Sequence, residues 1–227
     1  FLMVTIINAY NLIDGIDGLA AMVGIVISIM YMLIFYLSEE YFYSLLSIAL
    51  AACLIAFLYY NLSTTKKIFM GDTGSLIVGF MIAMFTIKFL ALNPSDYSAI
   101  PFHLENAPLV AIGILIVPLF YTARVFTILI ANRKGPFSPD RNHTHHILVD
   151  YLKLSHRQAS FLIASFNLVF VVLLVSLSNI SNLWMIIAIA GTCIGLGYLF
   201  FRLDYSVPNL KRRVFFKKKI EGFRDRY

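Results

Sequence analysis

The sequence predicts an all-α, polytopic integral membrane protein: a helical bundle of about six full transmembrane helices and one partial helix. Of its 227 residues, 60% are hydrophobic and only 13% are charged, and the mean hydropathy is +0.82. A soluble domain of this size could not bury so much apolar surface. The two cysteines, Cys53 and Cys193, lie inside apolar runs and indicate neither a disulfide framework nor a zinc site.

The apolar runs are long enough for the helix of about 20 residues that crosses a bilayer core. Phe1–Ile7 is interpreted as the end of a helix that begins upstream, because the chain starts without Met or a charged leader. Full spans are expected at Leu19–Leu37, Tyr41–Tyr60, Ser75–Leu92, Ala107–Ile130, Gln158–Leu177 and Leu183–Phe201. We therefore expect one membrane-embedded catalytic domain over residues 1–227, with a basic cytoplasmic tail at residues 202–227.

Charge is distributed unequally between the two ends of the predicted bundle. Of the 18 Lys and Arg residues, all but Lys88 lie on or close to the side that carries the three polar clusters described below. The opposite side carries Glu39, Glu40, Asp96 and Glu105. The positive-inside rule therefore places the clusters in the cytoplasm. The basic tail is expected to bind anionic lipid at the bilayer surface rather than nucleic acid.

The first polar cluster, NAYNLIDGIDGLA, has an amide or carboxylate at every third position: Asn8, Asn11, Asp14 and Asp17. In a helix this step sets each side chain back by about 60°, so Asp14 and Asp17 would share a face. Gly15 and Gly18 indicate that the helix does not continue straight. Alternatively, one aspartate caps the span that begins at Leu19. Capping accounts for one carboxylate but not for four regularly spaced polar side chains.

The second cluster is KKIFMGDTGS, in which Asp72 lies between two glycines just before a predicted span. Asp72 could cap that helix, with Thr73 or Ser75 as competitors. It could equally bind a hard cation, since Mg²⁺ prefers one or two carboxylates together with substrate phosphates. Phe69 is either an interfacial aromatic or a stacking platform, and both interpretations stay open.

The third cluster, GPFSPDRNHTHHIL, places three histidines beside Asp140 and Arg141: His143, His145 and His146. A zinc site is a weak interpretation, because no spaced fourth ligand is present. A surface histidine run is a further alternative. Phosphate binding by the arginine and the imidazoles is chemically easier. Together the three clusters favour group transfer on a phosphorylated, nucleotide-linked substrate at the membrane surface.

These three motifs, in this order, resemble those of the polyprenyl-phosphate N-acetylhexosamine-1-phosphate transferases. That family comprises polytopic enzymes that initiate bacterial cell-wall and surface-polysaccharide synthesis. The H-x-H-H form is more similar to the branch that uses UDP-N-acetylglucosamine or a related sugar. The resemblance implies a multi-pass protein of the bacterial inner membrane whose active site faces the cytoplasm.

The resemblance also implies roles for individual residues. Asp72 would be the ligand of Mg²⁺, or of Mn²⁺, and a catalytic residue together with Asp14 and Asp17, which would line the nucleotide pocket beside Asn11. Phe69 would stack on the uracil. The diphosphate or sugar phosphate would be held by Arg141, His143, His145 and His146. The phosphate of undecaprenyl phosphate would attack the β-phosphate of the UDP-N-acetylhexosamine, and UMP would leave.

The sequence departs from the family pattern at three points. The family carries an adjacent aspartate pair on an earlier cytoplasmic loop, which this chain lacks; we expect that spans upstream are missing or that the fragment alone is inactive. Tyr121 stands where an aspartate is common, and Gly135 stands where a serine is common. Tyr121 removes a carboxylate near the cytoplasmic half of its span.

Two other functions compete with catalysis. A transporter of phosphorylated lipid would carry charge inside its spans, and the candidates here are Lys88 and Arg124, both near span ends. Lys88 is expected to snorkel to the interface. A non-catalytic remnant that only binds is favoured by the absent aspartate pair. Dimerisation of two copies through the apolar spans is also an expectation.

Overall fold

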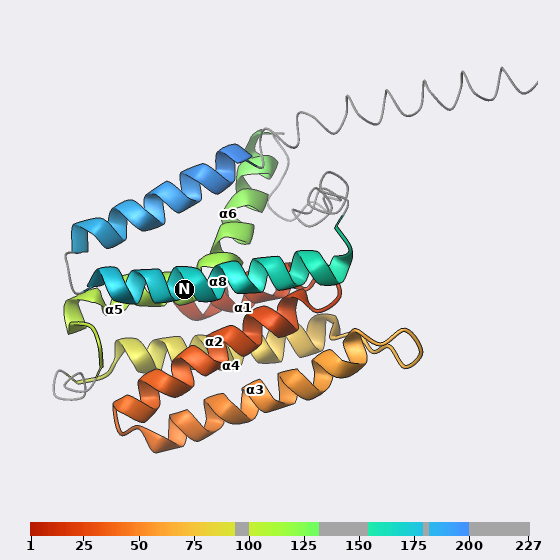
Figure 1. Ribbon diagram of the computed structural model, residues 1–227, viewed down its shortest axis with the longest axis horizontal. Helices are drawn as coiled ribbons and strands as arrows, with labels where there is room; N and C mark the ends of the chain where they lie inside the picture. Colours follow the sequence, from red (N-terminus) through yellow and green to blue (C-terminus); the bar gives the residue numbers. More distant parts are fainter. Residues whose placement is uncertain (94–99, 132–153, 179–181, 200–227) are drawn as a thin grey trace, which may run out of the picture.

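The computed structural model describes residues 1–93, 100–131, 154–178 and 182–199, and every regular element in these ranges is helical. The helices are α1 (Leu2–Ile13), α2 (Leu19–Leu37), α3 (Tyr41–Asn61), α4 (Gly71–Leu90), the short 3-10 helix η2 (Leu104–Asn106), α5 (Ala107–Ile114), α6 (Ile116–Ala131), α8 (His156–Ser178) and a last helix, Asn182–Leu199. The all-α prediction is confirmed. Figure 1 shows them as a bundle in which most helices run along one common direction.

The predicted number of membrane spans is also confirmed. Among the described residues, five helices are long and apolar enough to cross a bilayer, and α5 with α6 makes a sixth if the bent pair counts as one span. Helix α1 is the partial one, although it extends to Ile13 rather than ending at Ile7. Helix α4 begins at Gly71, earlier than the predicted Ser75. Both shifts place residues of the polar motifs inside helices.

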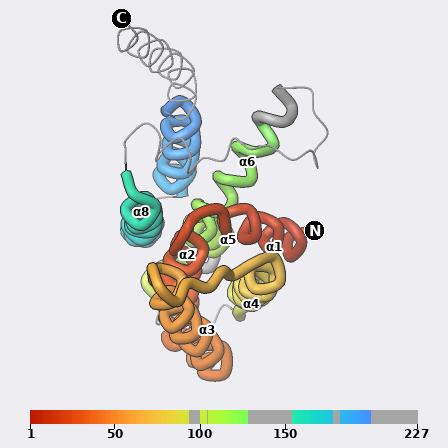
Figure 2. Tube along the Cα trace, turned by 90° about the vertical axis from the view of Figure 1, so that its right-hand side faces the viewer, coloured from red at the N-terminus to blue at the C-terminus, as the bar shows by residue number. Residues whose placement is uncertain are grey.

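The expectation of one continuous span at Ala107–Ile130 is wrong, because the chain bends by 73° between α5 and α6. Pro118 explains the break, since it has no N–H to donate to the carbonyl of Ile114 one turn earlier. That carbonyl instead accepts a hydrogen bond from the Asn167 side chain of α8, at 3.4 Å. Figure 2 shows α6 turning away from the other helices.

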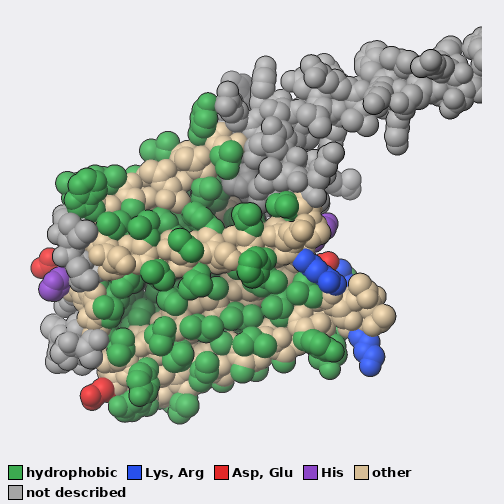
Figure 3. Space-filling view, viewed as in Figure 1, with side chains coloured by type: hydrophobic (Ala, Val, Ile, Leu, Met, Phe, Trp, Pro, Cys, Tyr) green, Lys and Arg blue, Asp and Glu red, His purple; other side chains and the backbone are tan. Residues whose placement is uncertain are grey.

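The helices pack in pairs, and the turns between them lie at two ends of the bundle. Helix α2 pairs with α3 and helix α1 with α4, while α8 lies against α2 and α5. Buried aromatic rings fill the core between α2 and α4, where the hydroxyl of Tyr31 lies 2.7 Å from that of Thr86. Figure 3 shows hydrophobic side chains along the sides of the bundle and Lys and Arg gathered at one end. The first two polar motifs meet at this basic end, which we call the site end.

The opposite end is held by an ion pair between two helices. Lys88, in the last turn of α4, donates to Oε1 of Glu40 and lies 5.2 Å from the centre of the Tyr43 ring. The ammonium therefore reaches the end of its span. The contact joins α4 to the α2–α3 turn at the end of the bundle remote from the site end.

Candidate active site

The first motif folds as a helix end followed by an irregular loop. Asn11 lies in α1, Asp14 is the C-cap of that helix, and Asp17 lies in the loop beyond. The backbone N–H groups of Asp14 and Gly15 bond to carbonyls two or three residues earlier, which closes the helix. The prediction that Asp14 and Asp17 share a helical face is therefore wrong, whereas the prediction that the helix does not continue straight is confirmed.

None of the three aspartates is the N-cap of α2 or α4, so the alternative in which an aspartate caps the start of a span is wrong. The N-cap of α2 is Gly18, and the N-cap of α4 is Met70; neither helix start has a side-chain capping bond. Asp72 instead lies in the first turn of α4. A carboxylate there is stabilised by the positive end of the helix dipole.

The first two motifs meet where α1 ends and α4 begins. The side-chain amide of Asn11 donates to Oγ of Ser75 at 2.7 Å and lies 3.4 Å from Oδ1 of Asp72. Burial, and then the negative charge of Asp72, raises the pKa of the Asp14 carboxyl above its usual value. Asp14, Asn11, Asp72 and Ser75 therefore form one polar cluster, which we call the carboxylate cluster.

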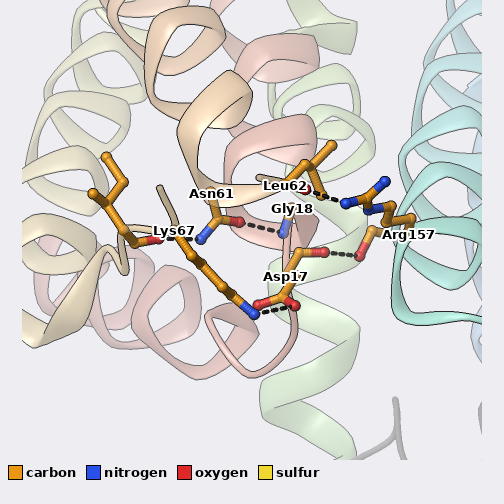
Figure 4. Close-up of polar contacts among 8 residues, drawn as sticks. Asp17, Gly18, Asn61, Leu62, Lys67 and Arg157 are labelled. Carbon is orange, nitrogen blue, oxygen red and sulfur yellow. Dashed lines mark hydrogen bonds and ion pairs between the residues drawn. The ribbon is translucent and has the colours of Figure 1, made fainter. Parts of the chain in front are cut away.

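Asp17 has a different partner. Its carboxylate accepts a hydrogen bond from Nζ of Lys67 at 2.6 Å, and both side chains are about one-third exposed. Its backbone carbonyl accepts a hydrogen bond from the hydroxyl of Ser160, at 2.8 Å, in the first turns of α8. Asp17 thus ties the α1–α2 loop to the loop before α4 and to α8 (Figure 4).

Phe69 is exposed to solvent in the loop that leads into α4. Its side chain is 74% exposed, and Nζ of Lys67 lies 5.1 Å from the centre of its ring. An exposed aromatic ring beside an ammonium group suits stacking on a base next to a phosphate. The interfacial alternative is equally compatible with this exposure.

The third motif, with Arg141, His143, His145 and His146, lies outside the described residues. After these residues, the first turn of α8 contacts the site end. Arg157 donates to the backbone carbonyl of Leu62 at the end of α3. Helix α8 therefore starts beside the loops of the first two motifs.

Sequence reasoning assigned no role in the site to several residues that build this end of the bundle: Asn61, Lys67, Ser75, Arg157 and Ser160. Lys67 and Ser75 stand within the second motif, so the motif itself was a signal for them. Asn61 is a buried amide at the end of an apolar span, a placement that calls for hydrogen-bond partners. Nothing in the sequence distinguished Arg157 or Ser160 from other polar residues near a span end.

The carboxylate cluster fits a divalent cation. Two carboxylates, an amide and a hydroxyl supply oxygen donors, which Mg²⁺ prefers, and Mg²⁺ leaves further positions to water or phosphate. The pKa of Asp14 is raised first by burial and then by repulsion from Asp72, and a nearby cation would offset that repulsion. Within the described ranges no group of three or more His, Cys, Asp or Glu side chains is suited to hold a metal ion, so the fit depends on this pair of carboxylates.

Tyr121 lies in α6 and is only 5% exposed. Its hydroxyl has no hydrogen-bond partner within the described part of the chain, and apolar residues of α6, α8 and the last helix line the cavity beside it. The position therefore adds no negative charge to the site end.

The fold and the site define a polytopic α-helical membrane protein with carboxylates gathered at one end of its bundle. Residues 1–90 match the family model of glycosyl transferase family 4. This part of the chain belongs to that family, and the resemblance drawn from the motifs is confirmed.

Curated relatives agree with this assignment. One, named "Probable undecaprenyl-phosphate N-acetylglucosaminyl 1-phosphate transferase", from Bacillus subtilis (strain 168), is 34% identical over 184 residues, 81% of this chain and 48% of the relative. A decaprenyl-phosphate N-acetylglucosaminephosphotransferase of Mycolicibacterium smegmatis is 34% identical over 71% of this chain and 42% of its own length. An undecaprenyl-phosphate alpha-N-acetylglucosaminyl 1-phosphate transferase of Yersinia pestis is 32% identical over 63% and 38%. The chain thus spans about half the length, or less, of these relatives.

Proposed function

We propose that this chain forms part of a membrane enzyme that transfers N-acetylhexosamine-1-phosphate, most simply N-acetylglucosamine-1-phosphate, from a UDP-sugar to undecaprenyl phosphate. The observation that carries the proposal is the carboxylate cluster, in which the first two motifs meet through Asn11, Ser75 and Asp72. The names of the relatives support the same reaction.

The reaction forms one bond and breaks one. A phosphate oxygen of the lipid attacks the β-phosphorus of the UDP-sugar, and the bond from that phosphorus to the bridging oxygen breaks. UMP leaves with the electron pair, and polyprenyl-diphosphate-sugar remains. A Mg²⁺ ion held by Asp72 and Asp14 would offset charge on the diphosphate oxygens.

Other residues of the site end are assigned to binding. Phe69 stacks on the uracil, and Asp17 fixes the loop that borders the nucleotide. Lys67, held between Asp17 and Phe69, lies where it can contribute positive charge toward a bound phosphate. The third motif is assigned to the diphosphate and sugar phosphate: Arg141, His143, His145 and His146.

The membrane setting of the proposal is the cytoplasmic face of a bacterial inner membrane. The site end carries Lys66, Lys67 and Arg157, whereas Glu39 and Glu40 lie at the opposite end, as the positive-inside rule requires for this orientation. The contacts of α8 with α2 and α5 support one catalytic domain, and the basic residues 202–227 are proposed as its cytoplasmic tail. Helix Asn182–Leu199 is only 6% buried, which leaves it to lipid or to a second copy in a homodimer.

The test is release of UMP from UDP-N-acetylglucosamine by the complete natural protein that carries this chain, with undecaprenyl phosphate in detergent micelles. We expect UMP release that requires Mg²⁺ or Mn²⁺ and that Asp72→Asn abolishes. Binding of either substrate without UMP release would contradict the proposal and favour the binding remnant or the transporter.

A further inference from the structure

Asn61 joins the two loops of the site end through a single buried side chain. It is the last residue of α3 and is 6% exposed. Its Oδ1 accepts a hydrogen bond from the backbone N–H of Gly18 at 2.7 Å, and its Nδ2 donates to the backbone carbonyl of Ile68 at 2.8 Å. Figure 4 shows the amide between the α1–α2 loop and the loop that leads into α4.

The two groups that Asn61 binds, the Gly18 N–H and the Ile68 carbonyl, are backbone groups outside regular helical hydrogen bonding. Gly18 is the N-cap of α2, at a helix start, where N–H groups lack helical acceptors. Ile68 lies in an irregular segment before α4. An N–H can only donate and a carbonyl can only accept, so these partners fix the orientation of the amide and use both of its ends.

The two bonds lie next to residues of the proposed nucleotide site. Gly18 follows Asp17, and Ile68 precedes Phe69. The Lys67–Asp17 ion pair links the same loops at a more exposed point, where solvent and salt weaken it. The Asn61 amide is 6% exposed and uncharged, so salt does not screen its two hydrogen bonds.

We propose that Asn61 is a positioning residue that sets the Phe69 loop against the Asp17 loop and thereby determines nucleotide affinity. This inference rests on the proposed function, because it assigns the base of the nucleotide to Phe69. Asn61 does not touch the reacting phosphates in this arrangement. Its loss should therefore weaken nucleotide binding and leave the chemical step largely intact.

The decisive variant is Asn61→Leu, which keeps the branching at Cγ and removes both hydrogen bonds. The matched control is Ser47→Ala, since Ser47 is also buried on α3 but bonds only to Tyr43 of its own helix. We expect Asn61→Leu to weaken UMP binding and raise the KM for UDP-N-acetylglucosamine, each by about tenfold, with kcat within about twofold. Ser47→Ala should leave UMP binding, KM and kcat unchanged.

Hydrogen exchange tests the link without any substrate. In Asn61→Leu, amides of both loops, residues 14–18 and 62–70, should exchange faster than in the parent protein or in Ser47→Ala. Asn61→Asp keeps an acceptor for Gly18 but cannot donate to Ile68 when ionised. It should loosen residues 62–70 while Gly18 stays protected, and it gives a second variant if Asn61→Leu does not fold.

The outcomes separate this inference from the proposed function. If the parent protein releases UMP while Asn61→Leu and Asn61→Asp bind UMP with unchanged affinity and KM, the positioning role is overturned. If the parent protein neither binds UMP nor releases it, the proposed function fails, and the nucleotide role of Asn61 fails with it. The exchange rates then decide whether the link between the loops exists at all.

Discussion

The side-chain amide of Asn11 donates to the hydroxyl of Ser75 at 2.7 Å, which fixes the end of α1 against the first turns of α4. The same amide lies 3.4 Å from Oδ1 of Asp72. Residues more than sixty positions apart in the chain thus share one hydrogen-bond network. The position of Asp72 depends on this junction, because Asn11 lies against its carboxylate and the Ser75 hydroxyl lies 3.1 Å from its backbone carbonyl oxygen.

Asn11→Leu tests whether the junction serves catalysis. We expect kcat/KM to fall by at least about tenfold, because Asp72 loses the group that orients it. The matched control is Asn8→Leu, since Asn8 is exposed on the same helix and donates only to the carbonyl of Val4. Steady-state assays of UMP release would compare the two. Equal losses would show that any amide on α1 matters and would contradict a specific role for Asn11.

Much of the fold follows from the sequence because long apolar runs and polar breaks leave few alternatives. The α2–α3 hairpin needed only the Ser38-Glu39-Glu40 break between two apolar runs. The bend at Leu115 was not predicted, since a proline inside a span is tolerated when a neighbouring helix supplies a donor. That donor, Asn167, lies on α8 and is distant in sequence.

The candidate site was predicted less completely than the fold. The motifs located Asp14, Asp17 and Asp72, because carboxylates in an apolar membrane protein are energetically costly and therefore indicate a functional site. They did not show that Asp14 lies near Asp72 while Asp17 pairs with Lys67, because that division depends on where α1 ends. The roles of Asn61 and Ser160 arise from contacts between helices, which no local pattern records.

Stability should depend on pH through Asp14 when no divalent cation is present. Its pKa is raised in the folded protein, first by burial and then by the charge of Asp72. The folded state therefore binds the proton more tightly than the unfolded state does, and stability falls as pH rises from the usual aspartate range through the raised pKa. Asp14→Asn removes this loss. Its Tm should exceed that of the parent protein at neutral pH.

The difference in Tm between Asp14→Asn and the parent protein should shrink as the pH is lowered through the raised pKa of Asp14, because the folded Asp14 carboxyl then binds a proton and, like the asparagine, carries no charge. Thermal unfolding in EDTA across this range would measure it. A difference that grows on acidification would contradict the assignment. Added Mg²⁺ should raise the Tm of the parent protein and leave that of Asp14→Asn nearly unchanged.

Phe69→Leu should weaken nucleotide binding without unfolding the protein. Stacking of a base on an aromatic ring contributes about 1–3 kcal/mol, so UMP affinity should fall by roughly tenfold or more. The side chain is 74% exposed, so the Tm should change little. Phe42→Leu is the control, because Phe42 is 69% exposed near the start of α3, at the opposite end of the bundle. Calorimetric titration with UMP would distinguish stacking from an interfacial role, for which both variants would bind UMP alike.

Replacement by alanine should destabilise the protein more at Gly18, at the start of α2, than at Gly71, at the start of α4. Gly18 and Gly71 both have positive φ, 82° and 64°, a conformation that costs an alanine roughly 1–2 kcal/mol. At Gly18 an added Cβ would also lie 3.1 Å from a methyl group of Leu62 and 3.3 Å from one of Leu58, whereas at Gly71 it would meet nothing within 4 Å. Gly18→Ala should therefore lower the Tm more than Gly71→Ala.

Comparing Gly18→Ala with Gly71→Ala also tests the hydrogen bond between Gly18 and Asn61. Gly18→Ala pushes against the end of α3 and strains the hydrogen bond between the Gly18 N–H and Asn61, so it should weaken UMP binding as well as stability. In Gly71→Ala that bond is untouched. Because residues in one network are not additive, Gly18→Ala combined with Asn61→Leu should be less destabilising than the sum of the two single changes. An additive double variant, measured by thermal unfolding, would mean that Gly18 and Asn61 act independently.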